Sequence, residues 1–239
     1  MLRYEKRTKQ HAAKFTDEVL AKLTVKEETV DDALAAVALL RQTKEIDPAR
    51  IYVLGHSWGG YLLPRIGAAD PQIAGLIVMA GPVRPQEDLM LEQYTYIFGL
   101  DGISDKEQAQ LDELAAQVAR VQDPGLSAAT PAADLPLGIP ASYWLDLRGY
   151  NPAEVAKGLT QPMLILQGGR DYQITVVDFE GWQSALASHA PEGTQLKLYP
   201  NLNHLFMAGE GKSTPAEYGI AGHVAEQVIG DIAGWMLLR

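Results

Sequence analysis

The chain has 239 residues, of which 47% are hydrophobic and 21% are charged, as in one globular domain or in one domain that carries an insertion. Its formal net charge of −10 argues against nucleic acid as a partner, because an acidic surface repels phosphate backbones. The absence of cysteine excludes disulfides, thiolate metal sites and a cysteine nucleophile.

The sequence predicts no association with a membrane. No apolar run reaches the roughly 18 residues that a spanning helix needs. The N-terminal stretch "MLRYEKRTKQHAAKF" is basic, but no apolar segment of a secretory signal follows it. We therefore expect a cytoplasmic location.

Four short runs predict the strands of one sheet, and helical patterns separate them. The runs are "IYVL" (51–54), "AGLIVMAG" (74–81), "PMLILQGG" (162–169) and "TQLKLYP" (194–200). The second and third are apolar throughout, which is typical of strands buried on both faces, whereas the fourth alternates and is expected nearer an edge. The helical patterns cover 30–43, 58–67, 177–189 and 220–238. This alternation predicts an α/β fold with a parallel sheet flanked by helices.

The interval 82–160 interrupts this alternation. It contains "EDLMLEQYTYIFGL", the polar helical pattern "SDKEQAQLDELAAQVARVQ" and a stretch rich in Pro, Gly and Ala, but no buried strand. We interpret residues 82–160 as a helical cap inserted between two parts of the core, 1–81 and 161–239. Insertions of this kind commonly carry specificity on a rigid scaffold.

The stretch "GHSWG" matches G-x-S-x-G, the nucleophile elbow of serine hydrolases. A sharp turn between strand and helix exposes the serine hydroxyl above the strand end, at the positive N-terminus of the next helix. The predicted strand 51–54 and helix 58–67 supply this context for Ser57. The alternative is an ordinary glycine-rich turn in which the serine caps the helix.

A serine hydroxyl needs a general base, and the base needs an orienting carboxylate. Asp171 follows the strand predicted at 162–169, and His204 follows the strand predicted at 194–200. The order Ser, Asp, His is that of α/β-hydrolases. All three candidates lie beyond the carboxyl ends of parallel strands, where ligands bind in open α/β sheets.

Other residues compete for these roles. Asp171 could instead cap the following helix or pair with Arg170, and Asp178 is a second candidate acid, although it falls inside a predicted helix. His204 could be a loop histidine without catalytic function. The remaining histidines have weaker placement, since none combines the chain order with a strand end; they are His11, His56, His189 and His223.

Several long motifs resemble the bacterial α/β-hydrolases that include EstD-type serine esterases and are close to dienelactone hydrolases. These motifs are "LRYEKRT" (2–8), "GHSWGG" (55–60), "IPASYWLDLRGYNP" (139–152), "LILQGGRDYQ" (164–173), "YPNLNHLF" (199–206) and "GEGKSTPAEYGIAGHV" (209–224). The resemblance extends over essentially the whole chain. It implies a serine esterase that acts on carboxylic esters with short acyl chains, with Ser57, Asp171 and His204 as its triad.

One departure from these relatives concerns the start of the chain. In them "LRYEKRT" follows the fourth strand of the sheet, whereas here it begins at residue 2. The expected fold is therefore an N-terminally truncated hydrolase. The backbone N–H of Trp58 is the expected first oxyanion donor, and the second, from the loop after the third strand, is expected to be missing.

The same departure predicts that strand 51–54 lies at an open edge of the sheet, which invites pairing with another chain. Three explanations compete: a start that is truncated relative to a longer natural protein, an N-terminal region (1–29) that covers the edge, or a homodimer. We expect the homodimer.

The leading functional hypothesis is a carboxylesterase whose substrate is a small-molecule ester and which needs no metal or organic cofactor. Tyr143 and Trp144 are candidate substrate-binding residues, and packing within the cap is their alternative role. A serine peptidase or thioesterase on the same fold is a second hypothesis. A truncated, catalytically weak hydrolase that binds a ligand or a partner chain is the third.

Overall fold

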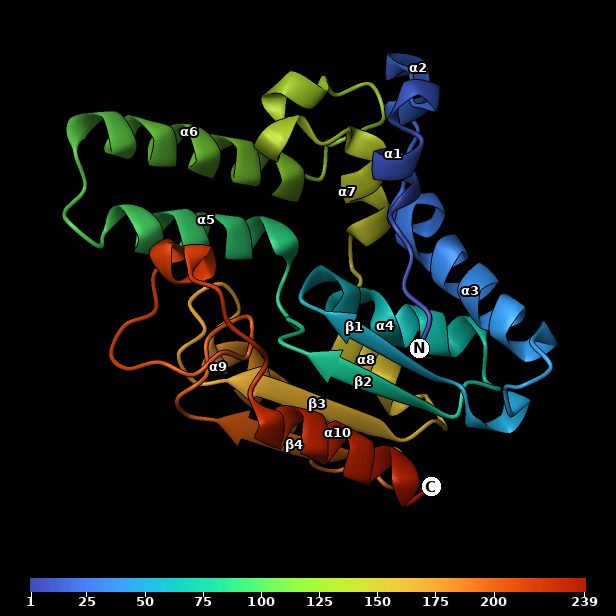
Figure 1. Ribbon diagram of the computed structural model, residues 1–239. Coiled ribbons are helices and arrows are strands. Elements are labelled where there is room, and N and C mark those ends of the chain that lie inside the picture. The colour runs from blue at the N-terminus through green and yellow to red at the C-terminus, as the bar shows by residue number, and fades with distance from the viewer. The chain divides into compact units, whose positions relative to one another are not determined.

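The computed structural model describes all residues, 1–239, and divides into two compact units (Figure 1). One unit contains Met1–Leu39 and Gln86–Tyr150, and the other contains Leu40–Pro85 and Asn151–Arg239. The second unit holds the sheet. The division into a core and a cap at residues 82–160 stays a prediction.

The sheet has four parallel strands in the spatial order β1-β2-β3-β4 (Figure 1). The strands are β1 (Tyr52–His56), β2 (Gly75–Met79), β3 (Met163–Gly168) and β4 (Gln195–Tyr199). The four strands and their parallel arrangement confirm the predicted fold class. β2 and β3 are buried along their whole length, as their apolar sequences predict, and β4 lies at an edge.

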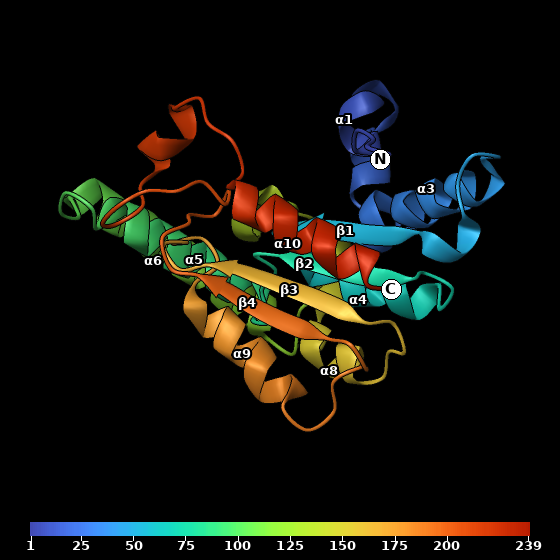
Figure 2. The ribbon, with the colours of Figure 1, turned by 60° about the horizontal axis from the view of Figure 1, so that its bottom comes forward.

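Helices cover both faces of this sheet (Figure 2). Side chains alternate between the faces, and on one face Ile77 and Leu166 pack with Val228 and Trp235 of α10 (Glu226–Leu237). The other face holds helices α4 (Trp58–Ala69), α8 (Pro152–Lys157) and α9 (Val176–Leu186).

The last helix begins later than predicted, at Glu226 instead of residue 220. The backbone N–H of Ala225 donates to the carbonyl of Phe206, 2.9 Å away. This long-range bond holds the preceding residues in an extended path, so a helical spacing of apolar residues does not become helix there.

The unit that contains Met1–Leu39 and Gln86–Tyr150 has no strand. Its helices are α1 (Arg7–Gln10), α2 (Asp17–Leu20), most of α3 (Asp31–Gln42), α5 (Gln86–Phe98), α6 (Asp105–Gln122) and α7 (Ala141–Leu147). α6 begins with a capping box between Ser104 and Glu107, and it buries a stripe at Leu111, Leu114, Val118 and Val121. No helix in the structure is both long and apolar enough to cross a bilayer.

Candidate active site

Ser57 lies in the turn between β1 and α4, in a backbone conformation that few side chains adopt. Its φ is 53° and its ψ is −118°. The Ser57 N–H donates to the carbonyl of Met79 at 2.8 Å, and the Ser57 carbonyl accepts from the N–H of Tyr61 at 3.0 Å. These bonds to β2 and α4 hold the turn in its strained form, as a nucleophile elbow requires.

Two of the three glycines around Ser57 are required by close backbone packing. A Cβ on Gly55 would overlap the carbonyl oxygen of Gly59, and a Cβ on Gly60 would lie 2.9 Å from the Cα of Gly81. A Cβ on Gly59 would meet nothing within 4 Å. The turn therefore depends sterically on Gly55 and Gly60, and not on the second glycine of the G-x-S-x-G pattern.

The structure brings Asp171 and His204 together. Nδ1 of His204 lies 2.7 Å from Oδ2 of Asp171, and these residues are 4% and 5% exposed. Because a carboxylate only accepts hydrogen bonds, Nδ1 carries the proton and Nε2 remains available as a base.

Asp171 also fixes its own loop, but it does not cap the following helix, because the N-cap residue of α9 is Thr175. Its Oδ1 accepts from the backbone N–H groups of Gln173 at 2.8 Å and Ile174 at 3.0 Å. One carboxylate oxygen thus fixes the loop while the other faces the histidine. The predicted pairing with Arg170 is replaced by an ion pair between Arg170 and Glu217, at 2.6 Å.

Gln167, at the end of β3, is a member of this site that the sequence analysis missed. Its Nε2 donates to the carbonyl of Ile174 at 2.7 Å and lies 3.3 Å from Oδ2 of Asp171. A polar residue that ends the apolar run "LIL" was the available signal.

His56 is also part of this site, although the sequence analysis gave it weaker placement than His204. Its Nε2 lies 2.8 Å from the backbone carbonyl oxygen of His204, and the two imidazole rings are 4.6 Å apart. Burial, and next the neighbouring His204, lower the pKa of His56 below its ordinary value. A neutral His56 thus links the residue before the nucleophile to the candidate base.

Ser57 therefore lies one residue from a side chain that touches His204, but the structure records no hydrogen bond between Ser57 Oγ and His204. Catalytic hydrogen bonds are often long before substrate binds and tighten in the complex. Trp58, whose N–H is the expected oxyanion donor, is the first residue of α4, and its ring stacks on Tyr61.

The competing acid, Asp178, has a different set of partners. It is 0% exposed and accepts from the backbone N–H groups of Val83 and Arg84, at 3.0 and 3.1 Å. Its Oδ2 forms an ion pair with the Arg84 guanidinium at 2.7 Å. These contacts tie the loop after β2 to α9, and Asp171 is the acid that contacts His204.

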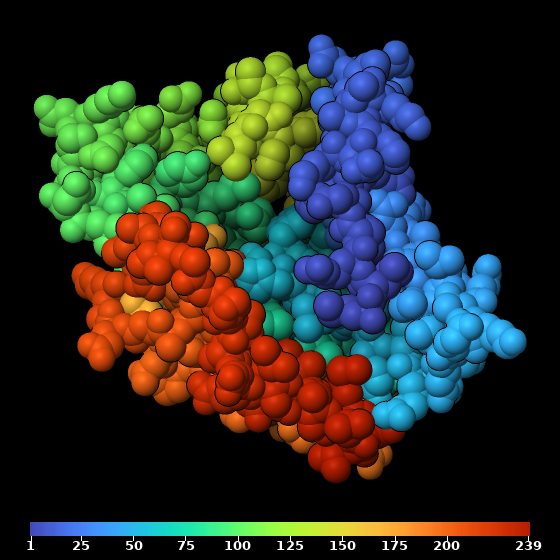
Figure 3. Space-filling view, in the orientation of Figure 1, coloured from blue at the N-terminus to red at the C-terminus, as the bar shows by residue number.

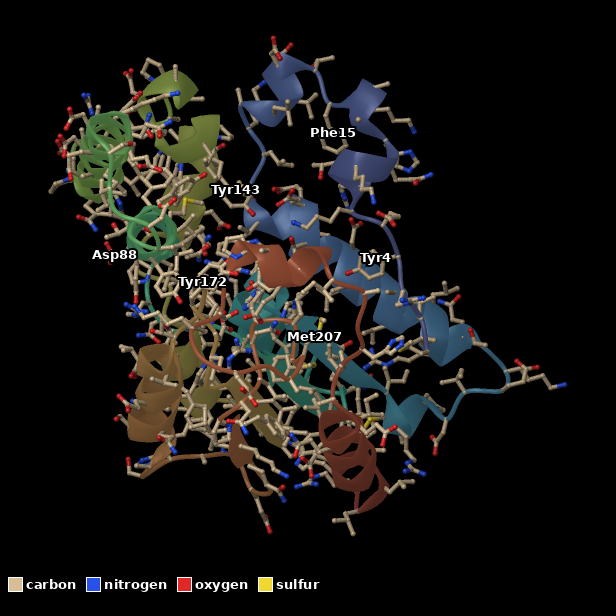
Figure 4. All side chains as sticks on the ribbon, turned by 60° about the vertical axis from the view of Figure 1, so that its left-hand side comes forward. Tyr4, Phe15, Asp88, Tyr143, Tyr172 and Met207 are labelled. Atoms are coloured by element: carbon tan, nitrogen blue, oxygen red, sulfur yellow. The ribbon has the colours of Figure 1, made fainter.

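Tyr143 and Trp144 are buried within the other unit, on α7. Figure 4 labels Tyr143. The Tyr143 hydroxyl donates to Glu28 at 2.8 Å, and the Trp144 indole donates to the carbonyl of Ile139 at 3.2 Å. These contacts agree with packing, and substrate binding by either residue stays a prediction. No group of three or more His, Asp or Glu side chains could hold a metal ion.

The comparison with known sequences identifies relatives over nearly the whole chain. Residues 20–218 match the alpha/beta hydrolase family. The chain is 40% identical to Esterase EstD of Thermotoga maritima over 238 residues, which are 99% of this chain and 53% of that protein. It thus spans about half the length of this curated relative.

Solved structures show the same fold at low sequence identity. A Klebsiella pneumoniae protein assigned as a dienelactone hydrolase has a TM-score of 0.51 at 17% identity, over 89% of this chain and 61% of that one. The alpha/beta hydrolase GrgF of Penicillium has a TM-score of 0.52 at 14% identity, over 90% and 72%. With the family match over most of its length and a parallel sheet flanked by helices, this chain belongs to the alpha/beta hydrolase family.

Proposed function

We propose that this protein is a serine carboxylic-ester hydrolase, with Ser57 as nucleophile, His204 as general base and Asp171 as orienting acid. One observation carries the proposal: the buried 2.7 Å contact between His204 and Asp171, in the same unit as the strained Ser57 turn. The similarity to a protein named as an esterase supports the choice of ester over other substrates.

The proposed reaction has two halves. His204 Nε2 takes the proton of Ser57 Oγ as the oxygen attacks the ester carbonyl, and the Trp58 N–H donates to the resulting oxyanion. The tetrahedral intermediate collapses, the alcohol leaves with that proton, and an acyl-Ser57 ester remains. Water then attacks the acyl group by the same route and regenerates Ser57. Asp171 keeps the proton on Nδ1 throughout and stabilises the imidazolium.

A fluorophosphonate probe tests the assembled triad. It should label the wild type and fail to label Ser57→Ala, because only an activated serine reacts at a useful rate. A wild type that resists the probe would contradict the proposal. p-Nitrophenyl esters of acetate, butyrate and octanoate would then report acyl preference, which we expect to favour the shorter chains.

A serine peptidase or thioesterase remains the alternative on this fold, since fold alone does not select the bond that is cleaved. Activity on amide or thioester substrates without activity on p-nitrophenyl esters would favour it. The further proposals from the sequence are a cytoplasmic location, a helical cap at residues 82–160 and substrate contacts from Tyr143 and Trp144.

The exposed edge of the sheet supports the proposal of a homodimer. β1 pairs with β2 on one side only, and Leu54 of β1 is 48% exposed. An apolar edge strand of this kind can pair with a second chain. Sedimentation at micromolar concentration should give the mass of two chains, and Leu54→Lys should shift it toward one. A wild type that sediments as one chain would exclude the dimer. The third hypothesis, a catalytically weak hydrolase, would be favoured only if the fluorophosphonate probe also failed to label the wild type.

A further inference from the structure

The segment 209–224, "GEGKSTPAEYGIAGHV", supplies no member of the proposed triad. It follows the His204 loop, contains the 3-10 turn Pro215–Gly219 and lies at the surface of its unit (Figure 3). Its contacts assign it a function in the arrangement of that triad.

Glu217 is the centre of these contacts. Its Oε1 accepts from Nη2 of Arg170 at 2.6 Å, and its Oε2 accepts from Nη1 at 3.2 Å. Its Oε2 also accepts from Nδ2 of Asn203 at 3.0 Å. A forked arginine–carboxylate pair fixes geometry as well as charge.

The same segment encloses the Arg170 side chain. Arg170 Nε donates to the carbonyl of Gly211 at 2.8 Å, and Nη2 donates to the carbonyl of Glu210 at 3.0 Å. A Cβ on Gly209 would overlap the guanidinium, so a larger residue there would displace Arg170 from these bonds. Arg170 is 8% exposed and Glu217 is 24% exposed, so this pair is more shielded than most surface ion pairs.

Glu217 has three side-chain partners: Ser213, whose Oγ donates to Oε2 at 3.4 Å, and the two residues that precede the members of the dyad. Arg170 comes immediately before Asp171, and Asn203 comes immediately before His204. Asn203 also shapes the histidine loop, because its Oδ1 accepts from the backbone N–H groups of Leu205 at 3.0 Å and Met207 at 3.1 Å. One carboxylate thus joins the loop of the acid to the loop of the base.

A neighbouring contact ties the segment to the acid loop a second time. The rings of Tyr172 and Tyr218 stack at 6.0 Å, and Gln173 Nε2 donates to the Tyr218 hydroxyl at 3.0 Å. Figure 4 shows Tyr172 and Met207 beside the turn at 215–219, and a Cβ on Gly222 would overlap the end of Met207.

We propose that Glu217 is a positioning residue that holds the Asp171 and His204 loops in register for proton transfer. This inference rests on the proposed esterase function. A catalytic group is effective only when its supporting contacts hold it to within about 0.5 Å of the productive position.

The first test compares Glu217→Gln with Asp70→Asn. Asp70 pairs with Arg41 at similar exposure, but it precedes β2 at the amino ends of the strands. With p-nitrophenyl acetate, Glu217→Gln should lower kcat roughly 10- to 100-fold with little change in KM, because misplacement of the base affects chemistry more than binding. Its kcat/KM should also reach half-maximum at lower pH, since a loosened Asp171 stabilises imidazolium less. Asp70→Asn should match the wild type in both.

The second test exchanges the acceptor and the donor. Asn203→Asp places a carboxylate against Glu217 and should lower kcat at least as much as Glu217→Gln. The double variant Asn203→Asp/Glu217→Gln again has one carboxylate and one amide, and it should recover at least tenfold of the lost kcat, a coupling of about 1.4 kcal/mol. A Glu217→Gln enzyme with wild-type kcat would overturn the proposal, and so would a double variant no better than Asn203→Asp.

Hydrogen exchange gives a reading that does not depend on activity. Glu217→Gln should speed exchange in the peptides that cover 168–176 and 200–208, which carry the two loops. Faster exchange confined to 209–224 would overturn the positioning role. Failure of the esterase function itself is recognised separately, because the wild type would then resist the fluorophosphonate probe.

Discussion

His56 Nε2 donates to the backbone carbonyl of His204 across 2.8 Å, so the residue before the candidate nucleophile holds the residue that carries the candidate base. The two residues are 148 positions apart in the chain, and their rings lie 4.6 Å apart. The N–H donor at Nε2 and the bulk of the imidazole ring contribute separately to the position of the His204 loop. Different substitutions of His56 remove one or the other.

The first prediction separates these contributions to kcat. His56→Leu keeps much of the bulk but loses the donor, and we expect kcat on p-nitrophenyl acetate to fall roughly tenfold or more, because the His204 loop is no longer fixed. His56→Gln can place an amide N–H near the position of Nε2 and should retain more of the activity. Steady-state kinetics of the two variants check this order, and equal activities would show that the hydrogen bond is unimportant.

The second prediction concerns stability against pH. The pKa of His56 is lowered in the folded state, chiefly by burial, whereas its ordinary value is 6.5. The unfolded chain therefore binds more protons at position 56 as pH falls through 6.5, and the folded state loses stability until its own lower pKa is reached. Two titratable neighbours also act on the pKa of His56: His204 lowers it and Asp171 raises it. Both neighbours remain in a His56→Gln variant.

Thermal unfolding between pH 7.5 and pH 5 tests this linkage. Tm of the wild type should fall more over this range than Tm of His56→Gln, which has no proton to bind there. Carboxylates with a lowered pKa, such as those of Asp70 and Glu217, lose their contribution only below their ordinary values of 3.8 and 4.5. Parallel Tm curves for the two proteins would rule out His56 as the cause.

Much of the fold could be predicted because strand signals are local. The four apolar runs, the edge character of β4 and the strand–turn–helix context of Ser57 all follow from short windows of sequence. The start of α10 could not be predicted in this way, because the bond between Ala225 and Phe206 replaces the first turns of the expected helix.

Chain order and strand ends also bring Asp171 and His204 forward as candidates, and the structure places them in contact. Of the supporting residues, only Gln167 has a local signal, as the polar residue that ends the apolar run "LIL". His56 and Glu217 have no local signature of their function. Their contacts join segments that only the folded sheet brings together. His56 in particular occupies the variable position of the elbow pattern, which says nothing about the loop it touches.

The third prediction makes the same chemical change at two buried aspartates. Asp171→Asn should lower kcat by about 10³- to 10⁴-fold, because the amide no longer stabilises imidazolium or holds the Nδ1 tautomer. Asp178→Asn should keep activity and fluorophosphonate labelling, but lower the free energy of unfolding by about 2 kcal/mol, because it removes the charge that faces Arg84.

Kinetics and urea unfolding on both variants check the assignment of the acid. The roles would be reversed if Asp178→Asn abolished labelling while Asp171→Asn retained it. Both variants keep an acceptor oxygen for the backbone N–H groups that these carboxylates now bind, so neither is expected to prevent folding.

The last prediction compares two glycines on either side of Ser57. Gly55→Ala would push a methyl group into the carbonyl of Gly59, and the backbone there cannot move without releasing Ser57 from its strained φ of 53°. We expect Gly55→Ala to lose most fluorophosphonate labelling and to unfold at a Tm several degrees lower, since overpacking costs roughly 1–3 kcal/mol.

Gly59→Ala is the matched control, because its new methyl group meets nothing within 4 Å and the residue lies in the first turn of α4. It should label at a rate close to that of the wild type and melt at the same or a slightly higher temperature, since alanine favours helix over glycine by about 1 kcal/mol. If the two variants lose labelling equally, then the second glycine of the motif is needed for a reason other than space, such as room for the substrate above the turn.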